Sequence, residues 1–342
     1  MTFPDLTGLG WSDHFARQLH VAETGAPARI TAVHRDRLAA LSPQGALMLL
    51  PAGPVADYAV GDWVLHDGQR VSRLLERASL IARRGAGTVA HRQAIAANVD
   101  TLGIVTSCNA DFNPARMNRY LVLAASAGVL PLVILTKADQ VPDDRPFRRQ
   151  AEALSPLVTA IALDARDPVD VARLAPWCRD GQTLALVGSS GVGKTTIQNA
   201  LTGTEEATRT IREDDAKGRH TTTARHLRQT RFGGWLIDTP GMRELGLAEA
   251  AEGIATVFAD VEALAGACRF SDCAHETEPG CAVRAAIEDG TLAAERLAQW
   301  RKLQREDQIA SQSVAEARAR DRALGRLYEQ GKKHARRKRA VD

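Results

Sequence analysis

The first part of the chain alternates short apolar segments with turn-forming residues. Four of these segments have the length of strands, namely residues 28–33, 46–50, 62–65 and 70–75. The last two are separated by Asp67-Gly68, which is a typical two-residue hairpin turn. Several short strands in so short a stretch predict a small β-barrel, and an OB-fold is the leading candidate.

A different pattern begins after the glycine-containing link at residues 85–87. Nearly continuous apolar segments of strand length lie at 101–106, 130–135, 157–163, 183–187 and 235–237. Segments with the length and spacing of helices, such as 114–127 and 145–154, separate some of them. Buried strands that alternate with helices predict a parallel α/β sheet with helices on both faces. From about residue 250 the pattern is helical, interrupted by a cysteine-containing loop.

The composition of the 342 residues, 44% hydrophobic and 25% charged, is that of a globular chain with a hydrophobic core. No apolar segment approaches the ~20 residues that a membrane helix needs, and the N-terminus lacks the pattern of a signal peptide. Five cysteines are an odd number and too few for a disulfide framework. We therefore expect a cytoplasmic protein without membrane contact, and a monomer.

Charge is unevenly distributed along the chain. Residues 301–342 contain thirteen Lys/Arg against six Asp/Glu, although the whole chain carries a formal charge of only +3. A basic tail favours a polyanionic partner, most commonly nucleic acid, although a tail that only keeps the protein soluble is the alternative. In the predicted barrel only Tyr58 and Trp63 could stack on bases, so contacts there would rely on arginines. These are Arg70, Arg73, Arg77, Arg83 and Arg84.

A glycine-rich loop follows the apolar segment 183–187 and leads into a helical segment. It matches G-x-x-x-x-G-K-[ST], a pattern whose backbone N–H groups surround nucleotide phosphates. In this interpretation Lys194 neutralises the β- and γ-phosphates and the Thr195 hydroxyl ligates Mg²⁺. The residues expected to bind the nucleotide here are Gly188, Ser189, Ser190, Gly191, Val192, Gly193, Lys194, Thr195 and Thr196.

Two further motifs complete a nucleotide site. Asp238-Thr239-Pro240-Gly241 ends an apolar strand, which places Asp238 to hold Mg²⁺ through water and the Gly241 N–H to reach the γ-phosphate. Thr136-Lys137-Ala138-Asp139 ends another strand, and its aspartate can accept both guanine N1–H and the exocyclic amine. Thr136 stands where Asn is usual and loses an amide contact. The backbone of Ala165, after the next strand, is placed to contact guanine O6.

The order of these motifs is informative. The base-reading motif precedes the phosphate loop, which precedes the D-x-x-G motif, whereas in Ras-like GTPases the phosphate loop comes first. The same sheet can close if the ordinary termini are joined and new ends open elsewhere, which predicts a circularly permuted GTPase. The chain then runs from the segment after Gly241 directly into the cysteine-containing region.

The segment at 204–230 is expected to be the switch that supplies a threonine to Mg²⁺ and the γ-phosphate. Thr222 is favoured over Thr221 and Thr223, which the sequence does not exclude. Met242 stands where Ras-like enzymes have the glutamine that orients water, so another group must do this. His220 is the nearest polar candidate by sequence, and a loop-capping or RNA-binding role for it is the alternative. Slow intrinsic hydrolysis, stimulated by a partner, is expected.

The cysteine-containing loop has the pattern Cys268-x4-Cys273-x-His275-x5-Cys281. Three thiolates and an imidazole satisfy tetrahedral Zn²⁺ without an open position, which predicts one structural zinc ion. Unconnected buried thiols or a redox pair are the alternatives. Cys108 and Cys178 lie in apolar segments and are expected in the core.

These motifs together resemble the RsgA family, the small ribosomal subunit biogenesis GTPases of bacteria. The stretches at 95–100, 119–122 and 218–223 are also similar to that family, over roughly residues 29–300, with Thr136 and Asp164 as departures. The resemblance implies the same zinc cluster, and a GTPase stimulated by the small ribosomal subunit that binds its rRNA late in maturation and leaves after hydrolysis.

We therefore expect a multidomain chain. Residues 1–28 form an extension, 29–85 an OB-fold-like barrel, 86–247 the circularly permuted GTPase domain, 248–300 a mainly helical zinc-binding domain and 301–342 a basic helical tail. Two other functions stay open. A P-loop kinase or ATPase would share the phosphate loop and Asp238, and an RNA-binding switch could hold GTP with little turnover.

Overall fold

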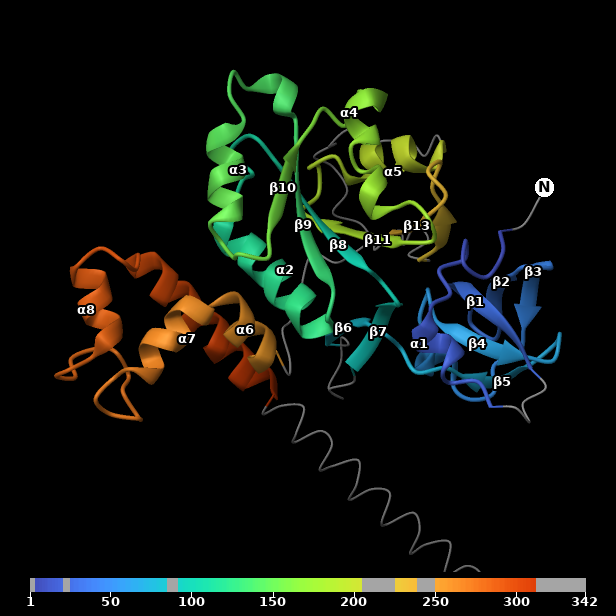
Figure 1. Cartoon of the computed structure of the whole chain (residues 1–342), viewed down its shortest axis with the longest axis horizontal. Helices are drawn as coiled ribbons and strands as arrows, with labels where there is room; N and C mark the ends of the chain where they lie inside the picture. The colour runs from blue at the N-terminus through green and yellow to red at the C-terminus, as the bar shows by residue number, and fades with distance from the viewer. Residues whose placement is uncertain (1–3, 21–24, 85–91, 205–224, 239–249, 312–342) are drawn as a thin grey trace, which may run out of the picture.

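The structure is a computed structural model that describes residues 4–20, 25–84, 92–204, 225–238 and 250–311. Three parts follow one another along the chain: an antiparallel sheet, a larger sheet flanked by helices, and a group of helices (Figure 1). The antiparallel sheet and the C-terminal helices lie on opposite sides of the larger sheet (Figure 1). No helix among these described residues combines the length and hydrophobicity that a membrane crossing needs.

The N-terminal sheet has the strand order β3-β2-β1-β4-β5, with every neighbouring pair antiparallel. Its strands are β1 (Ala26–Val33), β2 (Leu38–Ser42), β3 (Gly45–Leu49), β4 (Trp63–His66) and β5 (Val71–Leu74). A parallel bridge between Leu50 and Arg70 connects the two outer strands. There the Leu50 N–H donates to Gln69 O at 2.9 Å, and the Val71 N–H to Leu50 O at 2.9 Å. The sheet therefore closes on itself at this point. The sequence analysis missed β2.

The N-terminal segment packs against this sheet. It contains α1 (Asp13–Ala16), and the rings of Trp11 and Phe15 lie 4.8 and 5.7 Å from the ring of Trp63. The 3₁₀ turn η1 (Val55–Asp57) lies between β3 and β4. A separate pair of antiparallel strands, β6 (Leu80–Arg84) and β7 (Arg92–Ala97), leads from the barrel to the larger sheet. Neither strand of this pair was predicted from the sequence.

The larger sheet confirms the predicted parallel α/β arrangement. Its order is β10-β9-β8-β11-β13-β12, and only β12 runs antiparallel to its neighbour. The strands are β8 (Thr101–Ser107), β9 (Leu130–Thr136), β10 (Thr159–Ala162), β11 (Thr183–Gly188), β12 (Leu227–Gln229) and β13 (Trp235–Asp238). All residues of β8 and β11 are buried, as expected for strands covered on both faces.

Helices cover both faces of this sheet. One face carries α2 (Pro114–Ala127) and α3 (Arg145–Glu152), and the other carries α4 (Pro168–Ala172) and α5 (Lys194–Thr202) (Figure 1). Short 3₁₀ turns, η2 (Ala138–Gln140) and η3 (Ala175–Trp177), lie in the connections. The start of α2 follows ordinary capping rules, because Asn113 accepts a hydrogen bond from the Arg116 N–H and Pro114 occupies the first turn.

The C-terminal helices pack against α2. They comprise α6 (Ala251–Val257), α7 (Ala259–Gly266), α8 (Ala282–Glu288) and a last helical segment over 294–311. Arg119 of α2 forms an ion pair with Glu306 at 2.5 Å, and Asn118 of α2 hydrogen-bonds Gln299. The hydrophobic core is continuous from Leu9 through the larger sheet to Leu303. This cluster joins residues of all three parts, while the inside of the N-terminal sheet and the other face of the larger sheet have hydrophobic clusters of their own.

Arg29 of β1 connects the barrel to the larger sheet. Its side chain is 1% exposed and donates to Leu9 O at 2.6 Å, Asn98 O at 3.0 Å and Thr183 Oγ1 at 2.7 Å. Thr183 begins β11, whose other end leads into the glycine-rich loop. Desolvation lowers the pKa of Arg29 to about 10, so the guanidinium is still charged at neutral pH. A buried cation of this kind is retained only because its donors are satisfied.

Candidate functional site

The glycine-rich loop joins the end of β11 to the start of α5. Gly188 has φ +141° and a Cβ there would lie 2.1 Å from Val105 O, so the loop can pass β8 this closely only with glycine. Gly193 also has positive φ, at +97°. Lys194 Nζ donates to Gly188 O at 2.9 Å and to the Ser189 carbonyl, which holds the ammonium over the loop. The loop and the N-terminus of α5 thus have the geometry and polarity that suit an anion.

Two oxygen-bearing residues lie at the same edge of the sheet. Thr195 belongs to the first turn of α5, and Asp238 ends β13. In the parallel register Asp238 pairs with Leu186 of β11, two residues before Gly188. A hydroxyl and a carboxylate beside a phosphate-binding loop are the oxygen ligands that suit Mg²⁺.

Thr136 connects the base-reading motif to the phosphate loop. It ends β9, is 1% exposed, and its hydroxyl donates to Val192 O at 2.6 Å, with Thr106 O 3.1 Å away. Its side chain also packs on Gly193. The next residue, Lys137, has φ +58°, a conformation that non-glycine residues seldom adopt. The loss of an amide at 136 is therefore accompanied by a buried hydroxyl that contacts the phosphate loop.

The loops after β9 and β10 bring Asp139 and Asp164 together. Arg166 lies between the two carboxylates and donates to Asp139 Oδ2 at 2.6 Å and to Asp164 Oδ1 at 3.1 Å. Ala165, which lies between Asp164 and Arg166 in the chain, is 6% exposed. The sequence analysis considered Asp139 and Ala165 but missed Arg166. The only signal in the sequence was its position two residues after an unusual acidic residue.

Other predicted residues of this site cannot be placed. His220, Thr222 and Gly241 lie outside the described residues. Arg116, which the sequence analysis also missed, donates from the first turn of α2 to Ser189 Oγ at 2.5 Å. This contact connects α2, against which the C-terminal helices pack, to the phosphate loop.

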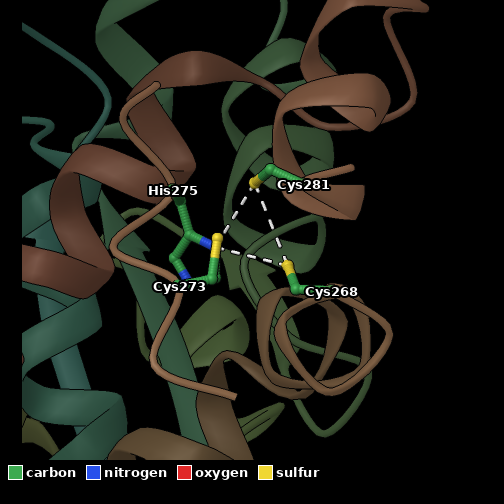
Figure 2. Close-up of side chains that lie close together, drawn as sticks. All are labelled: Cys268, Cys273, His275 and Cys281. Atoms are coloured by element: carbon green, nitrogen blue, oxygen red, sulfur yellow. Dashed lines mark hydrogen bonds between the residues drawn. The ribbon is translucent and has the colours of Figure 1, made fainter. Parts of the chain in front are cut away.

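The cysteine and histidine side chains converge in the loop between α7 and α8 (Figure 2). Cys268 Sγ and Cys281 Sγ are 3.9 Å apart, and each lies 3.5 Å from His275 Nδ1. Ligand atoms about 2.1–2.3 Å from a tetrahedral ion are separated by about 3.5–3.8 Å. The four ligand atoms, including Cys273 Sγ, lie within 4.8 Å of one another. The spacing therefore fits a metal ion, and it is too long for a disulfide.

The backbone around this cluster is held by its own hydrogen bonds. The carboxylate of Glu278 accepts from the N–H groups of Ala274, Glu276 and Thr277 at 2.8–3.0 Å. His275 is 7% exposed and its ring lies 5.8 Å from that of Trp300 in the last helical segment.

The other two cysteines lie away from this cluster. Cys108 and Cys178 are buried in the core, where desolvation raises the pKa of both thiols to about 11.

The fold and the site together define a class of protein. A phosphate loop lies after the central strand of a mostly parallel sheet, a D-x-x-G aspartate ends the neighbouring strand, and a base-reading motif ends a strand that precedes both in the chain. This is the arrangement of a circularly permuted GTPase.

Comparison with known proteins identifies the family. A family model described as RsgA GTPase matches residues 74–248. A small ribosomal subunit biogenesis GTPase RsgA from Mesorhizobium japonicum is 52% identical, over 89% of this chain and 90% of that protein. RsgA 2 from Vibrio vulnificus is 48% identical over 94% of each chain. The chain belongs to the RsgA GTPase family and is a GTP hydrolase.

Solved structures show the same fold. The crystal structure of YjeQ from Thermotoga maritima superimposes with a TM-score of 0.59 at 23% identity, and covers 81% of this chain and 96% of that one. YloQ, described as a circularly permuted GTPase, gives a TM-score of 0.58 at 23% identity, over 89% and 98%. The predicted permutation is confirmed.

Proposed function

We propose that this protein hydrolyses GTP to GDP and phosphate late in the maturation of the small ribosomal subunit, and that this subunit stimulates the hydrolysis. The observation that carries the proposal is the 52% identity to a small ribosomal subunit biogenesis GTPase over 89% of the chain. The geometry of the phosphate loop, with Lys194 held over its carbonyl groups, supports nucleotide binding at this loop.

Each part of the site has a role in this proposal. Lys194 and the N–H groups of the loop bind the β- and γ-phosphates, and Asp139 accepts the N–H groups of guanine. Thr195 and Asp238 hold Mg²⁺, which would neutralise charge that develops on the phosphate oxygens. The position of Thr195 in the first turn of α5 and that of Asp238 at the end of β13, in register with Leu186 of β11, support this assignment.

The attacking water needs an orienting group. Met242 has no polar atom that could orient it, and we assign this role to His220 and a Mg²⁺-facing role to Thr222. Both lie in the segment between the phosphate loop and β12, outside the described residues. A GTPase that lacks the usual glutamine should hydrolyse GTP slowly until a partner orders this segment.

The remaining assignments concern the flanking parts. The metal of the Cys268, Cys273, His275 and Cys281 cluster is one structural Zn²⁺, because three thiolates and an imidazole leave no open position. The closed five-stranded sheet is an OB-fold barrel, supported by the parallel bridge between its outer strands. The chain divides into 1–28, 29–85, 86–247, 248–300 and 301–342, in the order extension, barrel, GTPase domain, zinc domain and tail.

The partner is the small ribosomal subunit with its rRNA. The thirteen Lys/Arg of residues 301–342 support a polyanionic partner, since such a tail is attracted to phosphate groups. We place the protein in the cytoplasm as a monomer, in keeping with a ribosomal partner.

The test measures GTP hydrolysis by the purified full chain alone, with small ribosomal subunits, and with large subunits as the control. We expect small subunits alone to raise the rate about a hundredfold, equivalent to roughly 2.7 kcal/mol of activation free energy. A Lys194→Ala variant should lose the stimulated rate. Tight GTP binding without stimulation would contradict the proposal and favour an RNA-binding switch with little turnover.

A further inference from the structure

Arg166 connects the two acidic residues at the base-reading end of the site. Its Nη2 donates to Asp139 Oδ2 at 2.6 Å, while its Nε and Nη2 donate to Asp164 Oδ1 and Oδ2 at 3.1 and 3.2 Å. The Asp164 side chain is 24% exposed and that of Asp139 29%, so both carboxylates are partly shielded from water. Asp164 holds the arginine in a two-point contact, and the arginine in turn reaches Asp139.

The presence of Asp164 creates an electrostatic difficulty for a guanine site. A carboxylate has no proton to donate at neutral pH, so Asp164 cannot hydrogen-bond the Asp139 carboxylate or guanine O6. Without a cation between them, the two like charges would repel each other and turn the Asp139 side chain away. Arg166 removes this difficulty, and it also lowers the pKa of Asp164 by hydrogen bonding to the ionised form.

The contact leaves Asp139 able to bind a base. An ionised carboxylate has about four acceptor positions on its two oxygens. Arg166 uses one of them, on Oδ2, and guanine needs two for its N1–H and its amine. Among the described residues, Arg166 is the only one whose side chain donates to Asp139. Arg166 therefore holds the Asp139 carboxylate and leaves acceptor positions on it for the two guanine N–H groups.

We propose that Arg166 is a positioning residue for guanine recognition, which holds the Asp139 carboxylate in place and neutralises Asp164. This inference rests on the proposed function, because it takes Asp139 as the acceptor of the guanine N–H groups. In this proposal Arg166, two residues after Asp164, donates to Asp139 the hydrogen bond that the Asp164 carboxylate cannot donate.

The experiment measures binding of fluorescent GDP and ADP analogues to the full chain and its variants. Arg166→Gln should weaken GDP binding about twofold to fivefold, the upper part of the range for an exposed ion pair of good geometry. Adding Asp164→Ser to Arg166→Gln should restore most of the affinity, because the hydroxyl can donate to Asp139 and the extra negative charge is gone. Arg148→Gln, which breaks an exposed ion pair with Asp144 on α3, is the matched control.

Two comparisons separate positioning from general stability. In an Asp139→Ala background, Arg166→Gln should cause no further loss of GDP affinity, and the melting temperature of the nucleotide-free Arg166→Gln variant should equal that of the wild type. Tighter GDP binding by Arg166→Gln would overturn the proposal, since it would make Arg166 a competitor of guanine. Unchanged binding, or failure of Asp164→Ser to rescue, would also overturn it. If the wild type bound ADP as well as GDP, the proposed function itself would fail.

Discussion

At the scale of single residues, Thr136 shows how a departure from the usual motif is accommodated. A side chain amide at this position would add donors and acceptors, whereas the threonine hydroxyl has one proton, which it gives to a carbonyl of the phosphate loop, Val192 O, at 2.6 Å. The end of β9 and the phosphate loop are therefore connected through a buried hydrogen bond.

Thr136→Val keeps the shape of this side chain and removes its hydroxyl. We expect the free energy of unfolding to fall by about 1–3 kcal/mol, because the buried Val192 carbonyl loses its donor. GDP affinity should fall as well, since the loop loses its contact with β9. Denaturant unfolding and nucleotide titration measure the two effects. Thr136→Ser, which retains the hydroxyl, is the control, and a valine variant as stable as the wild type would contradict this role.

At the scale of elements, α2 and α6 approach each other unusually closely. Gly253 of α6 is buried against α2, where an added Cβ would lie 2.2 Å from Ser126 Oγ and 2.6 Å from Val122 O. The residue before α6, Ala250, donates from its backbone N–H to Asp307 Oδ1 in the last helical segment. At Gly253, the junction between α2 and the C-terminal helices is thus a close contact with no room for a larger side chain.

Gly253→Ala should destabilise this junction, because the new methyl group collides with the backbone of α2. We expect a loss of about 1–3 kcal/mol in the free energy of unfolding, the usual cost of overpacking. The matched control is Gly266→Ala at the end of α7, where an added Cβ meets nothing within 4 Å. That change should be neutral or slightly stabilising. Equal stabilities of the two variants would show that α6 can shift at no cost.

We expect the loop between α7 and α8 to depend on the metal ion proposed for its cysteine and histidine cluster. Removal of the metal from the full chain with a strong chelator should unfold this region, since the clustered thiolates lose the ion that holds them together. Hydrogen exchange should show that amides over 259–288 lose their protection while those of the larger sheet keep theirs. Elemental analysis should find about one zinc per chain, and Cys281→Ser should lose it. Unchanged protection after complete metal removal would rule out a structural role.

At the scale of the whole molecule, the barrel and the GTPase sheet form one unit through Arg29. The donors of this guanidinium reach the N-terminal segment, the β7–β8 connection and the start of β11. Asp100 and Asp62 lie close enough to favour its charged form. Since β11 continues into the phosphate loop, the position of the barrel and that of the nucleotide site are set by the same strand.

Arg29→Met should lower the free energy of unfolding by roughly 3–5 kcal/mol, because it leaves buried carbonyl groups and carboxylates without their cation. Arg179→Met is the control, since its ion pair with Asp180 is exposed and worth little. Chemical denaturation of both variants measures the difference. A loss below about 1 kcal/mol for Arg29→Met would mean that water or side-chain movement replaces these contacts.

Several features could be predicted from the sequence because they depend on local chemistry. The phosphate loop, the D-x-x-G strand and the cysteine cluster are short motifs, in which a few neighbouring residues determine the backbone and its ligands. The order of the motifs gave the permutation, because that order is a property of the chain itself. Strand β2 was missed because its residues, Leu-Ala-Ala-Leu-Ser, have no preference for strands and form one only by pairing with β1 and β3.

The sequence by itself therefore determined the class of chemistry: a phosphate loop, a base-reading aspartate and a set of soft metal ligands, each encoded within a short stretch. Only the tertiary structure decided which distant residues support them. Arg29 meets Thr183 across 154 positions, Arg166 meets Asp139 across 27, and Thr136 meets Val192 across 56. No local pattern encodes such pairs, because they arise when the packing of strands and helices brings separate segments to the same place.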